Sequence, residues 1–223
     1  MPKQTRTLYS YWRSSAAYRV RIALNLKGLP YEIAPVHLVE GGGQQHSDAY
    51  HDVNPQELVP TFVDGERVIR QSIAIIEYLD ETYPQTAPLL PSEPRARARV
   101  RALALAVACD IHPLNNTRVL KYLETELAIP LAERERWTRH WIELGLDAIE
   151  ELVAHDVATG RFCHGDSPTL ADAVLIPQIY NARRWSTDLS RYPTLQRIEA
   201  ACLELDAFAR ATPEVQPDAQ KAS

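Results

Sequence analysis

Two adjacent serines, Ser14 and Ser15, are the residues of this chain that are best placed to bind an anion. They follow the run Leu8–Trp12, whose aromatic and apolar residues are typical of a buried strand. From Ser15 onward apolar residues recur at helical spacing, so a helix is expected to begin directly after the pair. Free N–H groups and the positive end of the helix dipole meet at such a junction. The pair could therefore bind an anion, although a serine at this position also serves as an ordinary helix cap.

The residues after this helix predict three further strands, a short helical segment and a second long helix. In order, these are a strand at 31–36, the short helical segment, strands at 58–63 and 67–70, and a serine-capped helix that opens at Gln71-Ser72. Asp64-Gly65, between the last two strands, is a hairpin signal. This order is typical of a thioredoxin-like α/β domain, and Val59-Pro60 stands where that fold has a cis-proline. A cis bond would turn the backbone N–H and C=O of Val59 outward, toward a ligand beside Ser14.

A proline-rich stretch from Tyr83 to Pro94 marks a domain boundary, because proline at that density opposes regular structure. We predict a thioredoxin-like domain over residues 1–84, a linker over 85–94 and an all-helical domain over 95–223, with a loose C-terminal tail from Pro213. The helices predicted beyond the linker lie at 95–126, 131–157, 169–185 and 193–211. Thr169 and Asp172 have the spacing of a capping box at the start of the third of these.

The composition fits a soluble enzyme of a reducing compartment, which here means the cytoplasm. The net charge of −5 argues against a nucleic-acid partner, and no run approaches the roughly 18 apolar residues of a membrane span. The three cysteines, Cys109, Cys163 and Cys202, form neither a CxxC pair nor an even set. We expect free thiols that pack as small buried hydrophobes. No metal site is predicted.

Residues 14–24, SSAAYRVRIAL, resemble the motif S-S-C-x-x-R-V-R-I-A-L of the zeta-class glutathione transferases. This family comprises the maleylacetoacetate isomerases, with the related maleylpyruvate isomerases beside them. Further matches to the family are Asn54-Pro55, Val59-Pro60, Gln71-Ser72, Leu89-Leu90-Pro91, residues 109–116 and the Thr169–Asp172 pair. The resemblance extends from about Thr7 to Pro217 and implies the glutathione transferase fold, an N-terminal thioredoxin-like domain followed by an all-helical one.

The resemblance implies that glutathione is the cofactor and that its thiolate is the nucleophile. In this family the first serine of the motif is the best candidate to donate a hydrogen bond to the thiolate, which corresponds to Ser14, with Ser15 as a second donor. Which serine carries that bond stays open. The other positions that correspond to glutathione contacts are Gln45 at the glycyl end, Val59-Pro60 at the cysteinyl backbone, and Gln71-Ser72 at the γ-glutamyl carboxylate.

The reaction implied by the resemblance is a cis-to-trans isomerisation of a cis-enedioic acid. The thiolate adds to the activated double bond, the resulting single bond rotates, and elimination returns the thiolate. Arginine suits a substrate with two carboxylates because its planar fork binds each at two points. The family positions that correspond to substrate contacts are Arg13, His112, Asn116, Arg118 and Arg184. Arg183 could exchange roles with Arg184, and His112 could instead be a core or interface histidine.

Several functions stay open at this point. The expected activity is the isomerisation of maleylacetoacetate in tyrosine and phenylalanine breakdown, by a homodimer, as in the family. Ala16 replaces the family's cysteine, which leaves maleylpyruvate as an alternative substrate. A transferase that acts on haloacids or other electrophiles would use the same glutathione site. A non-catalytic interaction module is the alternative from another class, but such a module would have no need of thiol-activating groups.

Overall fold

The computed structural model describes residues 5–220 of the chain. The chain divides into two compact units, one running to Leu89 and joined by the segment that begins at Glu204, the other spanning Leu90–Leu203. The division after Leu89 falls inside the linker expected at 85–94. Lys27 and Asp80 hold the first part of that stretch, because they bind the carbonyl of Ala87 and the N–H of Leu89.

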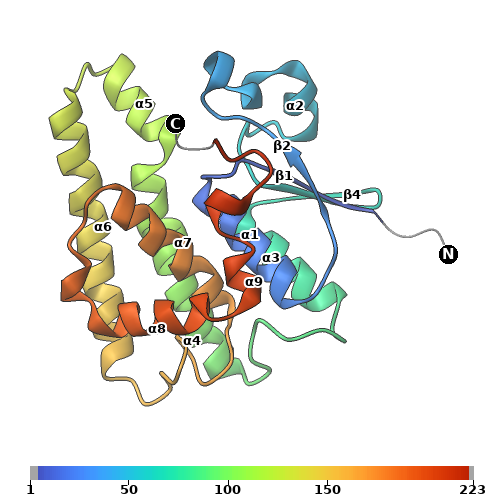
Figure 1. Ribbon diagram of the computed structural model, residues 1–223, viewed down its shortest axis with the longest axis vertical. Helices are drawn as coiled ribbons and strands as arrows, with labels where there is room; N and C mark the ends of the chain where they lie inside the picture. The colour runs from blue at the N-terminus through green and yellow to red at the C-terminus, as the bar shows by residue number, and fades with distance from the viewer. Residues whose placement is uncertain (1–4, 221–223) are drawn as a thin grey trace. The chain divides into compact units, whose positions relative to one another are not determined.

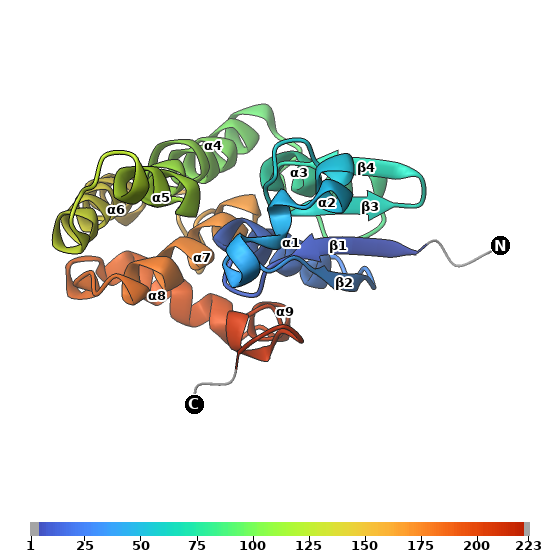
Figure 2. The same ribbon diagram turned by 90° about the horizontal axis from the view of Figure 1, so that it is seen from above.

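The first unit is built on a four-stranded sheet with the strand order β2-β1-β3-β4 (Figure 1). The strands are β1 (Arg6–Ser10), β2 (Glu32–Pro35), β3 (Thr61–Asp64) and β4 (Arg67–Arg70). β1 runs parallel to β2 and antiparallel to β3, and β3 and β4 form the hairpin that Asp64-Gly65 predicted (Figure 2). This confirms the thioredoxin-like arrangement. The first strand ends two residues earlier than expected, so Tyr11 and Trp12 are buried in the turn after it.

Three helices of this unit follow the order expected from the sequence, and a fourth comes from the end of the chain. They are α1 (Ser15–Leu26), α2 (Asp48–Val53), α3 (Ser72–Thr82) and α9 (Asp206–Ala209). α1 packs against both α3 and α9 (Figure 1). The fold therefore places the start of α1 directly after β1 and the start of α3 directly after β4.

The segment from Glu204 corrects the expected domain assignment and the expected loose tail. Arg21 Nε donates to the carbonyl of Ala211 at 3.0 Å, and the Trp12 N–H donates to Asp218 Oδ2 at 2.9 Å. Ala219 packs against the cluster that contains Tyr11 and Trp12. These contacts attach the segment to the first unit as far as the structure describes it, whereas the tail residues 221–223 lie outside the described range.

The second unit consists of helices and short turns. Its helices are α4 (Pro94–Leu105), α5 (Thr117–Thr125), α6 (Leu131–Ala154), α7 (Leu170–Arg184) and α8 (Pro193–Leu203). The helix expected over 95–126 is interrupted by a π-helical turn, Ala106–Ile111, and a 3₁₀ turn, His112–Asn115. Pro113 lies in this interruption and has no N–H to continue an α-helix. The helix expected over 193–211 also ends early, at Leu203.

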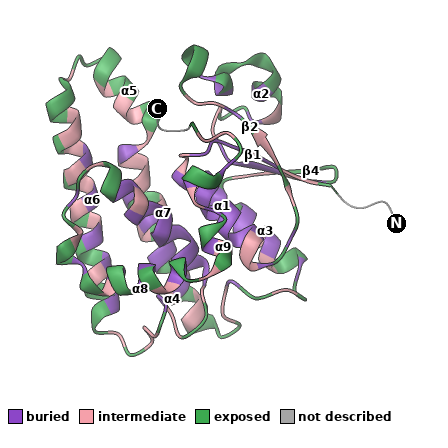
Figure 3. Cartoon of the chain, viewed as in Figure 1, coloured by how far each residue is buried: buried purple, intermediate pink, exposed green. Residues whose placement is uncertain are grey.

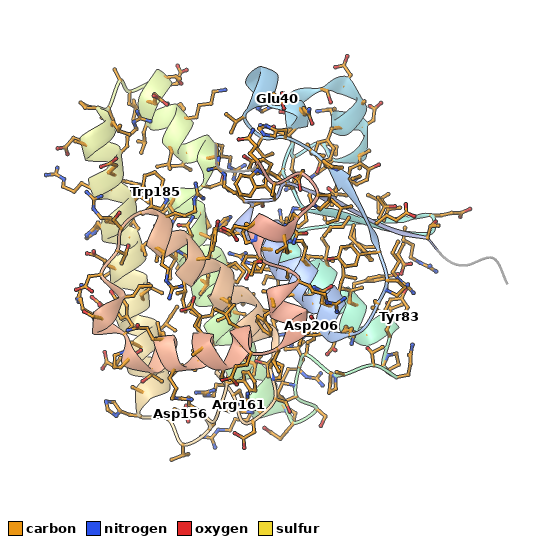
Figure 4. The ribbon with its side chains drawn as sticks, in the orientation of Figure 1. Glu40, Tyr83, Asp156, Arg161, Trp185 and Asp206 are labelled. Carbon is orange, nitrogen blue, oxygen red and sulfur yellow. The ribbon has the colours of Figure 1, made fainter. Side chains whose placement is uncertain are left out.

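α7 is the most buried helix of this unit, as the continuous purple along it shows in Figure 3. Its start is the predicted capping box: Thr169 caps the helix, and Asp172 accepts the Thr169 N–H at 2.8 Å. Asp156, labelled in Figure 4, lies in the loop after α6 and accepts a hydrogen bond from Arg99 of α4 at 2.7 Å. These contacts fix the loop that leads into α7.

The cysteines are free, as expected, but they do not all pack alike. Cys163 and Cys202 are buried, and burial raises the pKa of both thiols. Cys109 is exposed, which corrects the expectation of a buried residue. Within residues 5–220, no helix combines the length and the apolar composition that crossing a membrane requires.

Candidate functional site

Ser14 lies at the junction of strand and helix that the sequence predicted. It is the N-cap of α1, and its Oγ accepts the N–H of Ala17 at 3.2 Å. A hydroxyl that accepts in this way still has its own proton to donate. Ser15 is the first residue of the helix and is buried, while Ser14 is only half-buried. Ser14 can therefore cap α1 and donate to an anion at the same time, where the helix dipole also favours negative charge.

Arg13 brings a cation next to this junction. Its guanidinium lies over the ring of Trp12, 4.7 Å from the ring centroid, and Nη2 is 3.4 Å from the hydroxyl of Tyr11. Its Nε is buried and makes no hydrogen bond to any residue that the structure describes. The side chain is thus held by stacking and still has a donor for an anionic ligand.

The start of α3 differs from the serine cap that we expected. Gln71 occupies the N-cap position with φ 70° and makes no side-chain cap bond, and Ser72 is the first helical residue. The Ser72 hydroxyl instead accepts a hydrogen bond from Arg19 Nη1 at 3.2 Å. Positive φ is uncommon for a residue other than glycine and often occurs at ligand sites. The uncapped N–H groups at this helix start remain available for an anion.

The Val59-Pro60 peptide bond is cis. Tyr50 and Asn54 both donate to the carbonyl of Leu58, at 2.7 Å each, and so fix the segment before it. Burial raises the pKa of Tyr50, so its hydroxyl stays protonated and remains a donor. Among residues 5–220, nothing forms a hydrogen bond with the backbone N–H or C=O of Val59, which leaves both for an extended ligand.

Gln45 lies in the glycine-containing loop before α2 and is buried, with 9% of its surface exposed. Its Nε2 is 3.0 Å from Nε2 of His46. Its Oε1 is buried and has no hydrogen-bond partner in the described part of the chain. A buried polar atom without a partner is costly, so this oxygen is a candidate to bind a ligand.

One apolar cluster connects these segments of the first unit. Val59 packs in it with Tyr11 and Trp12, which precede Arg13 and Ser14, and with Tyr50 of α2. Leu38, at the start of the loop that carries Gln45, packs against the same cluster. The structure therefore brings together the predicted glutathione contacts of β1–α1, of the glycine loop and of the cis-proline segment.

The remaining predicted residues belong to the helical unit. His112 begins the 3₁₀ turn before α5, Asn116 caps α5 with its Oδ1 on the Arg118 N–H, and Arg118 is exposed. His112 Nε2 lies 3.5 Å from Asn116 Nδ2. These three residues therefore lie within the 3₁₀ turn and the start of α5, directly after the π-helical turn, a feature that frequently accompanies functional sites.

Arg183 and Arg184 are the last two residues of α7. Arg183 binds both carboxylate oxygens of the buried Glu199 of α8 through Nη1 and Nη2. Such a two-point contact fixes the guanidinium. Both arginines are exposed. Because Arg183 is engaged with Glu199, Arg184 is the better candidate of the two for a substrate carboxylate.

Sequence reasoning missed the roles of Arg19 and Arg21. Helical periodicity places both between the apolar positions of α1, yet both are buried, at 2% and 0% exposure. Arg21 donates to Ser10 Oγ and to the carbonyl of Trp12, so it holds the turn that leads to Ser14. The only sequence signal for these roles was their place in the motif of residues 14–24.

Comparison with known proteins identifies the family of the chain. The sequence model for "Glutathione S-transferase, N-terminal domain" matches residues 8–87. The chain is 54% identical over 213 residues to a protein of Vibrio cholerae named "Probable maleylacetoacetate isomerase", a match that covers 95% of this chain and 97% of that protein.

Two solved structures are similar over nearly all of the chain. A holo structure of maleylpyruvate isomerase, described as a bacterial glutathione S-transferase of the zeta class, has 50% identity and a TM-score of 0.93, covering 96% of this chain and all (100%) of that one. A maleylacetoacetate isomerase from Methylobacterium extorquens AM1, solved with bound malonate and GSH (glutathione), has 44% identity and a TM-score of 0.92, with the same coverage of 96% and 100%.

Proposed function

The chain belongs to the zeta class of the glutathione S-transferases, and on this premise we propose that it is a glutathione-dependent isomerase that converts maleylacetoacetate to fumarylacetoacetate. The observation that carries the proposal is the Ser14 hydroxyl at the start of α1. It stands in a chain that is 54% identical to a protein named as a maleylacetoacetate isomerase.

The residues of the first unit fit glutathione, a peptide with a thiol and two carboxylates. The free N–H and C=O of Val59 suit its cysteinyl backbone, and the uncapped start of α3 at Gln71 and Ser72 suits its γ-glutamyl carboxylate. The unpartnered Oε1 of Gln45 is a further polar group for its glycyl end. Ser14 and Ser15 are the hydroxyls left for the sulfur.

When bound, glutathione supplies the thiolate that adds to, and leaves, the double bond of the substrate. Ser14 favours the ionised thiol by donating its hydroxyl, which contributes roughly 1.5–3 kcal/mol. The start of α1 adds about 0.5–1 kcal/mol. At about 1.4 kcal/mol per pKa unit, these contributions lower the pKa of a thiol by roughly 1.5–3 units from its ordinary value of about 8.5. Most of the bound thiol is then ionised at neutral pH, and the hydroxyl contributes the larger part.

The substrate is proposed to be bound by arginines. It has two carboxylates, and negative charge develops on it as the thiolate adds, so donors with positive charge stabilise both the ground state and the transition state. We assign this role to Arg13, Arg118 and Arg184, with His112 and Asn116 beside Arg118. The bound malonate in the relative from M. extorquens is also a dicarboxylate, which supports an anionic substrate.

Maleylpyruvate is the second candidate substrate. The chain has 50% identity and a TM-score of 0.93 to a maleylpyruvate isomerase, and Ala16 replaces the cysteine usual in the family. Since glutathione supplies the nucleophile, this replacement affects substrate placement rather than the reaction. A transferase acting on haloacids would share the thiol site, and a non-catalytic module would need no thiol activation.

We further propose that the enzyme acts as a homodimer in the cytoplasm. The family resemblance supports the dimer. Its three free cysteines and its use of a reduced thiol both fit a compartment where glutathione is kept reduced. Sedimentation of the purified protein tests the dimer, because a species of single-chain mass would contradict it.

The activity itself is tested by isomerisation of maleylacetoacetate with and without glutathione, with maleylpyruvate in a parallel assay. We expect turnover that depends on glutathione, and the ratio of kcat/KM for the two acids identifies the substrate. Binding of glutathione without turnover of either acid would overturn the isomerase and favour a transferase or a non-catalytic module.

A further inference from the structure

Glu57, in the segment that follows α2, contacts two histidines. His46 lies next to Gln45 in the loop that also contains Glu40, which is labelled in Figure 4, and His51 lies on α2. Oε2 of Glu57 lies 2.5 Å from Nδ1 of His46, and its Oε1 lies 3.0 Å from Nδ1 of His51. These hydrogen bonds hold the pKa of Glu57 below its ordinary value. Glu57 is therefore a carboxylate at neutral pH, which can only accept hydrogen bonds.

This carboxylate determines which nitrogen of His46 carries the proton. Because Glu57 accepts at Nδ1, the proton of a neutral imidazole is on Nδ1, and Nε2 has a lone pair. Nε2 of His46 lies 3.0 Å from Nε2 of Gln45, so the Gln45 amide nitrogen donates to it. The same nitrogen also donates to the carbonyl of Leu38, at the longer distance of 3.5 Å. If the amide were reversed, Gln45 Oε1 would face the lone pair of His46 Nε2. Both atoms are acceptors, so they would repel each other and form no hydrogen bond.

The Gln45 amide is also confined by the backbone beside it. Gly43 has φ +107°, and a Cβ at that position would lie only 2.5–2.8 Å from the amide atoms of Gln45. The amide therefore occupies space that any other residue would fill at position 43. With Nε2 directed to His46, the buried Oε1 is the end of Gln45 that has no partner among the described residues.

We propose that Glu57 is a positioning residue for glutathione, which acts through His46 to present Gln45 Oε1, an acceptor, to the N–H of the glycyl peptide. This rests on the proposed function, which assigns Gln45 to the glycyl end. It adds that the group recognised there is the peptide N–H, and that Glu57 and His46, two residues outside the ligand contacts, hold the amide in this orientation together with the weaker contact to the Leu38 carbonyl.

The probe that isolates this contact is γ-glutamylcysteine, which lacks the glycyl residue and with it the N–H in question. Calorimetric titration at about pH 8, where an ordinary imidazole is neutral, gives the dissociation constants of glutathione and of γ-glutamylcysteine. Their ratio is the preference for glutathione. The ethyl ester of glutathione, in which the glycyl carboxylate is blocked and the N–H kept, is expected to retain most of that preference.

Glu57→Gln keeps the shape of the side chain but can donate as well as accept, so it no longer specifies the proton position on His46. We expect it to lower the preference for glutathione about three- to tenfold, the range of a single hydrogen bond, with little change in the binding of γ-glutamylcysteine. His46→Phe, which keeps a ring and removes both nitrogens, is expected to do the same. His51→Gln is the matched control, since His51 contacts the other oxygen of Glu57, and it should keep the wild-type preference.

Gln45→Ala separates failure of this inference from failure of the site assignment. We expect Gln45→Ala to lower the preference, and the double variant with Glu57→Gln to lower it no further, because both act on one contact. If Gln45→Ala lowers the preference but Glu57→Gln and His46→Phe do not, the positioning role is overturned and the site stands. If Gln45→Ala weakens the binding of glutathione and of γ-glutamylcysteine equally, the placement of Gln45 at the glycyl end is wrong, and the inference is wrong as well.

Discussion

Ser14 uses one side-chain oxygen for two purposes, and substitution can separate them. Oγ caps α1 by accepting the Ala17 N–H, while its proton remains for the thiolate. Ser14→Ala removes both functions, whereas Ser14→Gly removes the hydroxyl but caps a helix almost as well as serine, at a cost of only a few tenths of a kcal/mol.

We expect both variants to lose roughly 5- to 15-fold in kcat at pH 7, because loss of about 1.5–3 kcal/mol raises the pKa of the bound thiol to about 8 and lowers its ionised fraction from about half or more to about a tenth. Only Ser14→Ala should also lower the free energy of unfolding, by about 1 kcal/mol. Steady-state kinetics and urea denaturation measure the two effects. Full activity in Ser14→Gly would identify Ser15 as the donor, and Ser15→Ala is the variant to compare.

Arg183 and Arg184 form a natural pair of test and control at the end of α7. Arg184→Ala should raise the KM of the dicarboxylate roughly tenfold or more, because a charge-assisted contact is lost, with little effect on the KM of glutathione. Arg183→Ala should leave both KM values nearly unchanged but lower the melting temperature, because it leaves the buried Glu199 without its partner. If the two arginine variants shift the substrate KM equally, Arg184 has no specific role in binding.

At this scale, the sequence predicts residues whose chemistry follows from their position along the chain. Ser14 is predictable because strand, serine pair and helix are consecutive. Arg19 and Arg21 are not, because hydropathy patterns assign charged residues to solvent, whereas these two are buried by partners far away in sequence, Ser72 and Ala211. A pattern of side-chain types contains no information on such partners.

At the scale of elements, many of the candidate site residues lie at the beginnings of helices, among them Ser14, Ser72 and Asn116. The capping box of α7 is the clearest local signal that the structure confirms. Its Asp172 is fully buried and accepts the N–H groups of Cys163 and Thr169, both at 2.8 Å, so it ties the loop after α6 to the first turn of α7.

Asp172→Ala should therefore destabilise more than the loss of a cap alone. It leaves two buried N–H groups without acceptors, and we expect a decrease in the free energy of unfolding of about 2–4 kcal/mol. Thr169→Ala, which removes only the capping hydroxyl, should cost about 1 kcal/mol. Urea denaturation of both variants measures the difference, and equal losses would mean that Asp172 does no more than cap the helix.

The interruption between α4 and α5 shows the limit of helical periodicity. Residues 95–126 have helical spacing throughout, yet the helix changes to a π-helical turn at Ala106–Ile111 and stops before Asn116. Pro113 was the available signal, since its ring cannot continue the helix. The interruption matters because it determines where His112, Asn116 and Arg118 lie. A continuous helix would place His112 and Asn116 on one face, four residues apart, and turn Arg118 away from them.

At the scale of the whole molecule, the last part of the chain belongs to the same compact unit as the first part. The segment from Glu204 packs with the N-terminal unit, and the Trp12 N–H bonds to Asp218, 206 residues later in the sequence. The sequence predicted a helix as far as residue 211 and a loose tail from Pro213, because chain ends are poorly ordered unless other parts of the protein hold them. The order of this segment comes from partners in the first unit, namely Arg21, Asn25 and the cluster around Trp12, which no local pattern could indicate.

The hydrogen bond between Asp218 and the Trp12 N–H connects the end of the chain to the candidate site. Asp218 fixes the backbone of Trp12, two residues before Ser14, and so the turn that presents the hydroxyl. Asp218→Ala should leave the Trp12 N–H without its acceptor and lower kcat several-fold, since such an unpaired group costs about 1–3 kcal/mol that a shifted turn can relieve. Asp218→Asn keeps an acceptor oxygen and should stay close to wild type.

Kinetics at saturating glutathione, together with denaturation of both Asp218 variants, separate this effect from a general loss of stability. A decrease in kcat for Asp218→Ala that exceeds any decrease in the fraction of folded protein would show that the last residues shape the turn at Ser14. Wild-type kinetics in Asp218→Ala would mean that Arg21, through its bond to the carbonyl of Trp12, is sufficient to hold the turn. An equal decrease in both variants would instead make the negative charge of Asp218, and not its hydrogen bond, the property on which the site depends.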